Sequence, residues 1–413
     1  MVVSTFPSLT TTFLVNRIQG LIERGFDVHI LAEHPGMRGV EVDQERRSLL
    51  PRVRWASPDR GASRLRMGFC GLSRLATRHP LAALQAWNPL RFRGLAGGRL
   101  AAMAAAAVAL PRPDAVLGCF GPMGELACSV RALGIFDAPV LTSFHGVDAY
   151  GKDMEHLRAR YRLLRRQGDV FLPVSRHMAK HLQDVGLPIR RTAVLCTPIR
   201  CERFPWHAPR RRPVGQPARL VGLGRLVAKK GFDDGLRVVA ELVKRGVALH
   251  YEIVGDGVEE PRLRALAAEL GIMHQVTFAG QRSHAEVRSA LEQSDLLLST
   301  NRVAANGDCE GIPNTIKEAM ASGVPVVATR HSGTPELIED GVCGLLADEG
   351  DIAALADACV RMLGDNALAH ACAVEARRRV EQMFDERRLN DRLAALLTAS
   401  AMRWRRRRAR CAA

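Results

Sequence analysis

The chain has 413 residues, of which 47% are hydrophobic, 25% are charged and 36 are glycine. This composition is typical of a globular protein, and it excludes a disordered chain, a collagen and a small disulfide-stapled module. At roughly 150 residues per domain, the length predicts two or three domains. The 59 basic and 43 acidic residues give a net charge of +16, which suits phosphates, nucleic acid or an anionic membrane.

Apolar periodicity predicts the elements of the first half. In chain order they are a strand at 1–4, a helix at 10–24, a strand at 26–32, a helix at 101–110, strands at 114–119 and 139–144, a helix at 156–167, and a strand at 170–174 before a helix capped by Ser175. Residues 35–95 are rich in arginine and poorly patterned. The first strand is shorter than the usual 5–6 residues or so, and we therefore expect the true start of the protein to lie upstream.

The second half alternates regularly between strands and helices. The predicted order is a strand at 220–223, a helix at 232–245, a strand at 250–254, a helix at 261–270, a strand at 276–279, a helix opened by a Ser283–Glu286 capping box, a strand at 296–299, a helix at 313–322 and a strand at 324–328. This alternation predicts a parallel, doubly wound sheet. Residues 205–217 hold four prolines and few apolar side chains, a composition typical of a linker between domains.

Cysteine spacing and apolar runs limit the location of the protein. The ten cysteines form no C-x-x-C pair, so we expect neither a zinc site nor a disulfide framework, and a reducing cytoplasm is the expected compartment. The N-terminus lacks the basic region and apolar run of a signal peptide. Residues 100–110 are the most apolar stretch and are too short for a bilayer crossing, which needs about 20 residues. A soluble or peripheral protein is therefore expected.

In a doubly wound sheet, ligands bind beyond the carboxyl ends of the strands. Arg225 follows the first strand of the second half, and Lys230 comes five residues later, just before a predicted helix. These cations at a helix N-terminus are suited to a diphosphate, although a solvated charged turn would use the same residues. Gly255 and Gly257 follow the next strand and would let the backbone approach a ligand, or would simply form a turn. His145 ends a first-half strand beside a glycine, where a ligand role and a structural role both remain open.

The segment 310–318 carries the most specific pattern. Pro313 stands where a helix would begin, which leaves the amides near Gly311 and Asn314 without partners inside the helix. Glu310 precedes this helix start, and Glu318 lies about two turns along the helix. Complementarity to the helix dipole would explain Glu310 without a ligand, and a surface salt bridge would explain Glu318. The apolar neighbours of Glu318 instead favour a packed carboxylate that binds sugar or ribose hydroxyls.

Taken together, these segments resemble the retaining, nucleotide-sugar-dependent glycosyltransferases of family 4, which have the GT-B fold. The motifs are G-L-G-R-L-V-A-K-K-G at 222–231, G-D-G at 255–257, E-G-I-P-N-T-I-K-E-A-M at 310–320 and H-S-G-T-P-E-L at 331–337, with the E-x7-E spacing as the family hallmark. F-H-G-V-D at 144–148 and N-G-D-C-E-G at 306–311 look most like bacterial exopolysaccharide enzymes of the colanic-acid and amylovoran type. Two departures stand in the first half: threonines at 10–12 where the family has S-E-T-F, and no Gly-Val-Asp at 196–200.

The resemblance implies an α/β protein with two doubly wound, Rossmann-like domains that face each other across a cleft. We expect an acceptor-side domain at 1–204, a linker at 205–217, a nucleotide-sugar-binding domain at 218–384, and a C-terminal helix with a basic tail at 385–413. The implied catalytic residues are Glu310, His145, Arg225 and Lys230. The implied donor-binding residues are Arg225, Lys230, Gly255, Gly257, Glu310, Gly311, Ile312, Pro313, Asn314, Thr315 and Glu318. No paired-aspartate metal motif is evident, so no metal or cofactor is expected, because cationic side chains can stabilise the leaving diphosphate.

The function expected from this resemblance is retaining transfer of a hexose from a UDP- or GDP-sugar to a glycan or lipid-linked acceptor in exopolysaccharide synthesis. A nucleotide-sugar epimerase of the same fold is the first alternative, and its first-half candidates are His145 and Asp148. A nucleic-acid-binding protein is the second alternative. Only 5% of the residues are aromatic, and no basic stripe with interleaved aromatic residues occurs, so no nucleic-acid partner is expected.

Exopolysaccharide transferases act on lipid-linked acceptors, so we expect a cytoplasmic enzyme that docks on the inner face of the plasma membrane. The candidate residues are arginines interleaved with apolar side chains, namely Arg64, Arg66, Arg74, Arg78, Arg91, Arg93 and Arg99 with Leu65, Met67, Phe69, Leu72, Leu75, Leu90 and Phe92. The basic tail at 403–408 adds Trp404 as an interfacial residue. A solvated charged face, inflated by arginine-rich codon usage, is the alternative.

Overall fold

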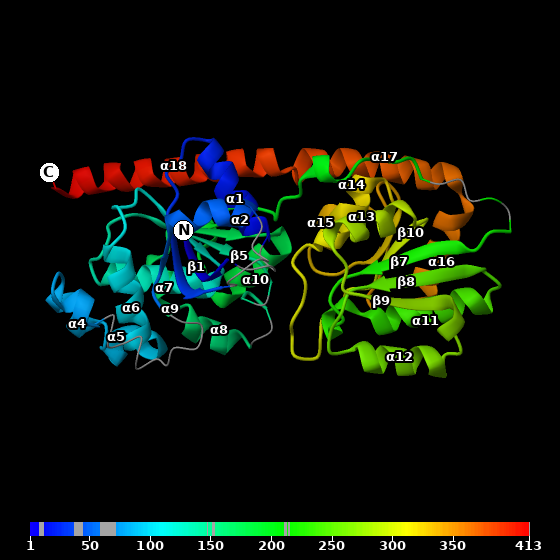
Figure 1. Cartoon of the computed structure of the whole chain (residues 1–413), viewed down its shortest axis with the longest axis horizontal. Helices are drawn as coiled ribbons and strands as arrows, with labels where there is room; N and C mark the ends of the chain where they lie inside the picture. Colours follow the sequence, from blue (N-terminus) through cyan, green and yellow to red (C-terminus); the bar gives the residue numbers. More distant parts are fainter. Residues whose placement is uncertain are drawn as a thin grey trace.

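The computed structural model describes residues 1–7, 12–36, 44–57, 72–146, 148–150, 153–209, 213 and 215–412. In these residues the chain forms two α/β domains, each built on a six-stranded sheet (Figure 1). Every strand pairing within the two sheets is parallel. The predicted fold class of two doubly wound sheets is confirmed.

The N-terminal sheet has the order β3-β2-β1-β4-β5-β6. Its strands are β1 Val2–Phe6, β2 Ile30–Pro35, β3 Val53–Trp55, β4 Val116–Cys119, β5 Val140–Phe144 and β6 Val170–Pro173. Its helices are α1 Thr12–Glu23, α2 Gln44–Leu49, α4 Pro80–Gln85, α5 Pro89–Phe92, α6 Gly98–Val108, α7 Gly121–Ala132, α8 Met154–Arg160, α9 Arg162–Gln167 and α10 Arg176–Val185. The strand order reverses between β1 and β4, the arrangement of a Rossmann-like sheet.

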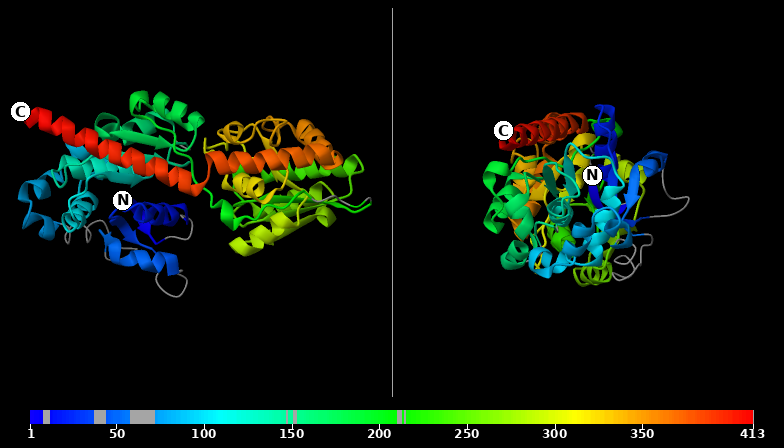
Figure 2. Two further views of the ribbon diagram at one scale, coloured as in Figure 1. Left: turned by 90° about the horizontal axis from the view of Figure 1, so that it is seen from above. Right: turned by 90° about the vertical axis from the view of Figure 1, so that its left-hand side faces the viewer.

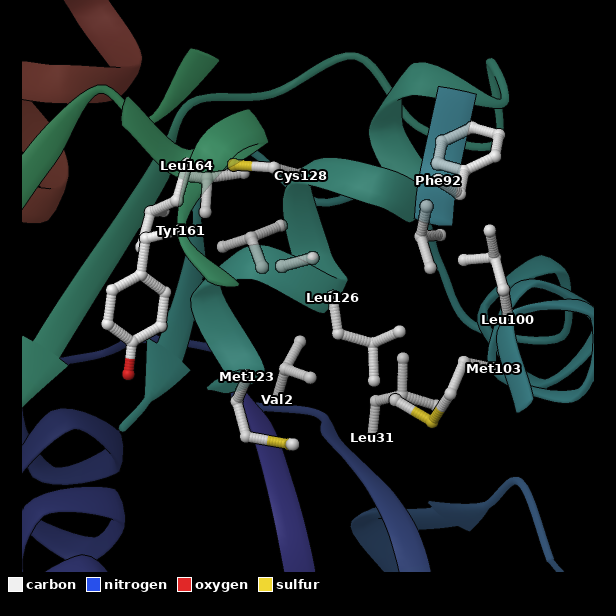
Figure 3. Close-up of a cluster of buried hydrophobic side chains, with 14 of the residues drawn as sticks. Val2, Leu31, Phe92, Leu100, Met103, Met123, Leu126, Cys128, Tyr161 and Leu164 are labelled. Atoms are coloured by element: carbon white, nitrogen blue, oxygen red, sulfur yellow. The ribbon is translucent and has the colours of Figure 1, made fainter. Parts of the chain in front are cut away.

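Alternate side chains of this sheet enter two apolar layers. Val2 and Leu31 pack on one face with Met103 of α6 and Leu126 of α7, as Figure 3 shows. Val3 points to the other face and packs with α1 and the C-terminal helix. Because both faces are covered, most residues of these strands are buried, as expected for a parallel sheet.

The C-terminal sheet repeats the same topology, with the order β12-β11-β10-β7-β8-β9. Its strands are β7 Ala218–Leu223, β8 Leu249–Val254, β9 Val276–Gly280, β10 Leu296–Ser299, β11 Val326–Thr329 and β12 Leu345–Ala347. Its helices are α11 Phe232–Lys244, α12 Glu260–Glu269, α13 His284–Glu292, α14 Asn314–Ser322, α15 Thr334–Leu337, α16 Ile352–Gly364 and α17 Asn366–Met383. The strand order reverses here between β7 and β10, and ligands of doubly wound sheets bind beyond such a reversal.

The chain crosses between the domains at two adjacent places. Ile199 donates its amide to Phe384, and Glu386 donates its amide back to Ile199. From there α18, Glu386–Ala412, runs back along the N-terminal domain, as both Figure 1 and Figure 2 show. Its Leu389, Leu393 and Leu397 pack in the same apolar layer as α1. The domain boundaries predicted at residues 204, 217 and 384 stay a prediction.

Several predicted elements are confirmed with shifted bounds, and some predictions are wrong. The first strand has five residues rather than four, so the expectation of a short strand is wrong. The second strand begins at Ile30 rather than at residue 26, because its pairing with β3 starts there. The predicted helix at 156–167 is two helices that meet at Tyr161, where the buried Tyr161 hydroxyl donates to the carbonyl of Asp148. The expected caps at Ser175 and at Ser283 with Glu286 are confirmed.

The side chains predicted to face a membrane are only partly exposed. Leu75 and Phe92 are buried in the core, and Arg99 pairs with Glu33. Trp404 lies under the guanidinium of Arg131 and donates to Asp137, so it is not a free interfacial residue. The predicted residues Arg64, Leu65, Arg66, Met67 and Phe69, and the threonines at 10 and 11, lie outside the described residues. Among the described helices, none has the length and apolar character that a membrane crossing requires.

Candidate functional site

The loop after β7 places two predicted cations beside the switch point of the C-terminal sheet. The Arg225 side chain is exposed, and its guanidinium makes no hydrogen bond or ion pair within the described parts of the chain. The 3-10 turn Ala228–Lys230 then leads through Gly231 into α11. Gly231 has a φ of +62°, and a Cβ there would lie 1.9 Å from the carbonyl oxygen of Thr300. Glycine is therefore required where this loop meets the end of β10.

The glycine turn after β8 lies directly against this loop. Leu226 donates its amide to the carbonyl of Asp256 at 2.7 Å. A Cβ on Gly255 would lie 2.0 Å from the carbonyl oxygen of Gly224, and a Cβ on Gly257 would lie 2.4 Å from the carbonyl oxygen of Leu226. The structure thus brings the predicted Gly255–Gly257 turn and the Arg225 loop together.

Glu310 connects the second loop of the switch point to the lysines of the first. Its carboxylate lies 3.4 Å from the ammonium groups of both Lys229 and Lys230. Burial by itself raises the pKa of Glu310, but the two lysines outweigh burial and lower that pKa to about 2. Glu310 is therefore a carboxylate at neutral pH.

The two lysines differ in their surroundings. Lys229 is buried and also pairs with Asp308 at 3.1 Å, so two carboxylates neutralise it. Lys230 has Glu310 as its one ion-pair partner among the described residues. The ammonium group of Lys230 is therefore less completely neutralised and better suited to bind an anion. This agrees with the selection of Lys230 from the sequence.

The predicted helix start at 313 is one residue early, and α14 begins at Asn314 with Pro313 in the cap position. The first turn of α14 has no side-chain cap, so its amide donors are open to a ligand. Gly311, Ile312 and Pro313 are buried beneath this turn, whereas Asn314 is exposed and Thr315 half-buried.

Glu318 lies on α14 and is half-buried. Its carboxylate makes no hydrogen bond or ion pair to any part of the chain that the structure describes. Burial raises the pKa of Glu318, against the opposing charges of Lys317 and Lys230. A carboxylate in this setting is suited to accept hydrogen bonds from hydroxyl groups.

His145 comes from the N-terminal domain and reaches the same region. Its ring lies between those of Phe13 and Phe120, with centroids at 4.6 and 4.8 Å. Nε2 contacts the hydroxyl of Ser143 at 3.0 Å, and the buried Nδ1 has no partner. Burial lowers the pKa of His145 well below its usual value, so the ring is neutral at pH 7. The backbone of His145 also faces Gly311 closely, which joins the two domains at this point.

Asp148, the other first-half candidate for epimerase chemistry, has a structural role. Its carboxylate accepts backbone amides from Gly121, His145 and Gly146. Burial raises its pKa, and these amide donors oppose the rise. The Asp148 side chain thus holds the loop after β5 against the start of α7, and its carboxylate is occupied by these hydrogen bonds.

His331, which was not predicted from the sequence, is fully buried and contacts the backbone of Glu310. Its Nε2 accepts the backbone amide of Glu310 at 3.1 Å, and its Nδ1 contacts Glu349 at 2.6 Å. The sequence did contain an indication of its importance, because His331 is the first residue of the H-S-G-T-P-E-L motif. A lone histidine before a helix does not by itself indicate which backbone group it holds.

Glu336 and Lys317 are two further residues that the sequence analysis missed, and both connect the domains. Glu336 of α15 accepts the amides of Arg176 and His177 at 2.8 Å each, and so caps α10 across the interface. Lys317 of α14 is fully buried and donates to the carbonyl of Thr197 at 2.6 Å. Burial lowers the pKa of Lys317 to about 8.

These residues can bind a diphosphate beside a polyhydroxylated group. Arg225, Lys230 and the open amides of α14 are donors and positive charges for an anion, whereas Glu310 and Glu318 are acceptors for hydroxyls. Within the described residues, no three His, Cys, Asp or Glu side chains come together as a metal site requires. The expectation that no metal or cofactor takes part stays a prediction.

Comparison with known families and proteins is consistent with this geometry. Residues 10–203 match the family described as Glycosyltransferase Family 4, and residues 208–379 match Glycosyl transferases group 1. The chain is 34% identical over 402 residues to WcaL of Escherichia coli K12, a glycosyltransferase assigned to colanic acid biosynthesis, and the match covers 95% of this chain and 98% of that protein. It is 31% identical over 403 residues to the amylovoran biosynthesis glycosyltransferase AmsK of Erwinia amylovora, with 95% and 97% covered.

Solved structures share the fold over nearly the whole chain. The Anabaena protein HepE, solved with UDP-glucose, aligns with a TM-score of 0.69 at 17% identity, covering 96% of this chain and 99% of that one. Sucrose-phosphate synthase from Thermosynechococcus elongatus gives the same TM-score and identity, with 96% and 98% covered. Both alignments extend over the two domains with their pair of six-stranded sheets. From the family matches and the relatives covered almost end to end, the chain belongs to glycosyltransferase family 4, with the GT-B fold.

Proposed function

We propose that this glycosyltransferase moves a hexose, with retention of anomeric configuration, from a UDP- or GDP-sugar to a glycan or lipid-linked acceptor in exopolysaccharide synthesis. The observation that carries the proposal is the cluster at the switch point, where Lys230, Glu310 and the uncapped start of α14 converge. The names of WcaL and AmsK support the pathway. The structures of HepE with UDP and with UDP-glucose support the donor class.

The proposed reaction breaks the bond between the anomeric carbon and the diphosphate oxygen. The electron pair of that bond stays with the diphosphate, and Arg225, Lys230 and the α14 amides stabilise the growing negative charge. The acceptor hydroxyl forms the new bond on the face that the leaving group occupied, and its proton passes to the departing diphosphate. Glu318 accepts the ribose hydroxyls, and Glu310 accepts hydroxyls of the donor sugar. Neutral His145 lines the sugar from the N-terminal side.

In this proposal Glu310 exchanges one partner for another. In the structure Lys230 neutralises the Glu310 carboxylate at 3.4 Å. A diphosphate beside Lys230 competes for that ammonium, and hydroxyls of the sugar then satisfy the carboxylate. Lys229 stays bound to Glu310 and Asp308 throughout and keeps the loop in place.

The test is release of nucleoside diphosphate from a panel of UDP- and GDP-hexoses, with acceptor lipid extract added, followed by NMR of the product linkage. Glu318→Gln keeps the size of the side chain but removes its charge, and it should raise the KM for the donor at least about tenfold through weaker hydroxyl binding. Lys244→Ala, at the exposed end of α11, is the control variant. Release of diphosphate from no donor, or a product of inverted configuration, would refute the proposal.

The same assay separates the epimerase alternative. An epimerase would convert the nucleotide sugar without an acceptor and would form no new glycosidic bond. It would also need a free acid and base on the N-terminal side, whereas Asp148 is held by three backbone amides. The geometry therefore favours transfer.

We also propose a cytoplasmic location, with peripheral docking on the inner face of the plasma membrane. The proposed donor is a cytoplasmic metabolite, and the proposed acceptor is carried by a lipid. The net charge of +16 supports attraction to anionic lipid headgroups. Cell fractionation checks this location, since a peripheral enzyme sediments with membranes at low salt and is released by high salt.

A further inference from the structure

The end of the N-terminal domain that lies away from the C-terminal domain carries exposed apolar side chains. Within ten residues of α4, α5 and their connection, Leu81, Leu84, Trp87 and Leu90 are exposed by 73%, 76%, 45% and 84%. We call these four residues the distal patch. Scattered single apolar residues are normal on a surface, but a contiguous group marks an interaction site.

The packing of these helices explains why the patch faces outward. Ala82, Ala83, Ala86 and Phe92 occupy the inner side of the same segment and are buried in the N-terminal core, where Figure 3 shows Phe92. Asn88 caps α5 by accepting the backbone amides of Leu90 and Arg91. The segment is thus firmly attached to the domain and still presents its large side chains to the surroundings.

The described sequence around the distal patch is rich in arginine. Among the described residues 72–113, six are arginine and none is aspartate or glutamate. Arg74, Arg78 and Arg93 are exposed, and none of the three pairs with a carboxylate in the described residues. The arginine-rich end of α18 lies at the same end of the molecule, as Figure 1 and Figure 2 both show.

We infer that the distal patch is a docking surface for an anionic lipid bilayer. Leucine and tryptophan side chains enter the boundary between headgroups and acyl chains, while the surrounding arginines bind the anionic headgroups. A second copy of the chain is a poor occupant, because a symmetric contact would oppose arginines to arginines. Nucleic acid is also a poor occupant, because the patch offers three leucines but only one aromatic ring for base stacking.

This inference deepens the proposed function and rests on it for its biological purpose. Docking by this end leaves the contact between the domains, and with it Lys230 and Glu310, in the aqueous phase where nucleotide sugars arrive. It therefore suits an acceptor whose sugar end extends from the lipid by a glycan. The vesicle-binding property itself can be measured without any donor or acceptor.

The test is co-sedimentation of the full chain with vesicles of phosphatidylcholine alone and with added phosphatidylglycerol. We expect binding to the anionic vesicles at low salt and release at high salt. The triple variant Leu81→Ser, Leu84→Ser and Leu90→Ser should lower the partition coefficient onto anionic vesicles at least about tenfold. The double variant Arg74→Glu and Arg78→Glu should lower it by about fivefold or more for each arginine. Val360→Ser with Val374→Ser, and Lys244→Glu, are matched controls on the C-terminal domain and should bind like the wild type.

A second readout keeps the test decisive if a variant folds poorly. Brominated lipids should quench the fluorescence of Trp87 in the wild type, and Trp87→Phe should lose that quenching while Trp206→Phe keeps it. Equal binding of the leucine variant and the wild type would overturn the inference. So would a dimer that the leucine variant breaks, or binding to duplex DNA in preference to vesicles.

Donor binding on the same preparations separates this inference from the proposed function. If vesicle binding fails while UDP or GDP still binds, the docking surface is wrong and the transferase proposal stands. If no nucleotide binds while anionic vesicles still do, the proposed donor class is wrong and the docking surface stands.

Discussion

Lys230 carries the positive charge that we assign to the leaving diphosphate. Lys230→Ala should lower kcat/KM by roughly 100-fold to 1000-fold, by analogy with loss of one donor to a developing oxyanion. Initial rates at saturating and limiting donor separate the loss of kcat from any rise in KM. Lys244→Ala should keep the wild-type rate, and a Lys230→Ala enzyme of wild-type kcat/KM would show that the diphosphate binds elsewhere.

Its neighbour Lys229 should contribute to stability rather than to leaving-group binding. Because Lys229 is buried between Asp308 and Glu310, Lys229→Met leaves buried carboxylate charge without its partner. Breaking such a pair costs about 3 kcal/mol. Urea unfolding should therefore show a larger loss for Lys229→Met than for Lys230→Ala, and equal losses would contradict this division of roles.

Lys317 should make stability depend on pH in the alkaline range. Its folded-state pKa is lowered to about 8, below the unfolded value of 10.5. Between these values the unfolded chain binds more protons, so the contribution of Lys317 raises stability as the pH rises from 8 to 10.5. The observable is the free energy of unfolding of the wild type minus that of Lys317→Met, measured at pH 8 and at pH 10. A difference that stays constant or falls would contradict the buried, partly neutral lysine.

At the scale of elements, α10 and α15 belong to different domains and share one cap. Glu336→Ala removes both acceptors from the start of α10, a loss of about 1 kcal/mol. Because the lost contact lies between domains, we expect a larger radius of gyration by small-angle scattering and a raised KM for the donor. Glu286→Ala removes a similar cap inside α13 and should leave the radius unchanged. An equal radius in wild type and Glu336→Ala would show that this cap does not hold the domains together.

Local sequence rules predicted the C-terminal domain better than the N-terminal domain. The strand at 296–299 and the capping box at Ser283 were predictable because pattern, cap and breaker residues agree there. The strand β3 at Val53–Trp55 was missed, because only Val53 of its three residues is buried and no alternation can show in so short an edge strand. The break at Tyr161 was missed because no helix-breaking residue marks it, and the contact of its hydroxyl with the carbonyl of Asp148 is tertiary.

The candidate site shows the same division between local and tertiary signals. The glycines, Lys230 and Glu310 were predictable because they follow strands at one edge of a sheet, where short loops and helix starts can be recognised from glycine, proline and capping residues. His331 and Glu336 were not, because each acts on a backbone group distant in the sequence, namely the amide of Glu310 and the start of α10. Membrane-facing residues were predicted from alternation with arginine, but packing buries Leu75 and Phe92 and exposes Leu81 and Leu84.

At the scale of the whole molecule, two copies of one sheet topology meet at the edges where the candidate site lies. The N-terminal domain contributes His145 and the start of α10, and the C-terminal domain contributes the cations and the glutamates. The two chain crossings lie side by side at Ile199 and Asp385. Domain closure over a bound donor would exclude water and favour transfer over hydrolysis.

The most direct test of this account is hydrogen–deuterium exchange of the full chain with and without saturating UDP or GDP. The account predicts that one of the two nucleotides slows amide exchange in residues 224–231, 255–257 and 310–318, and that Lys230→Ala weakens this protection. Protection confined to the N-terminal domain, or none with either nucleotide, would contradict the claim that the switch point of the C-terminal sheet binds a nucleotide-sugar donor.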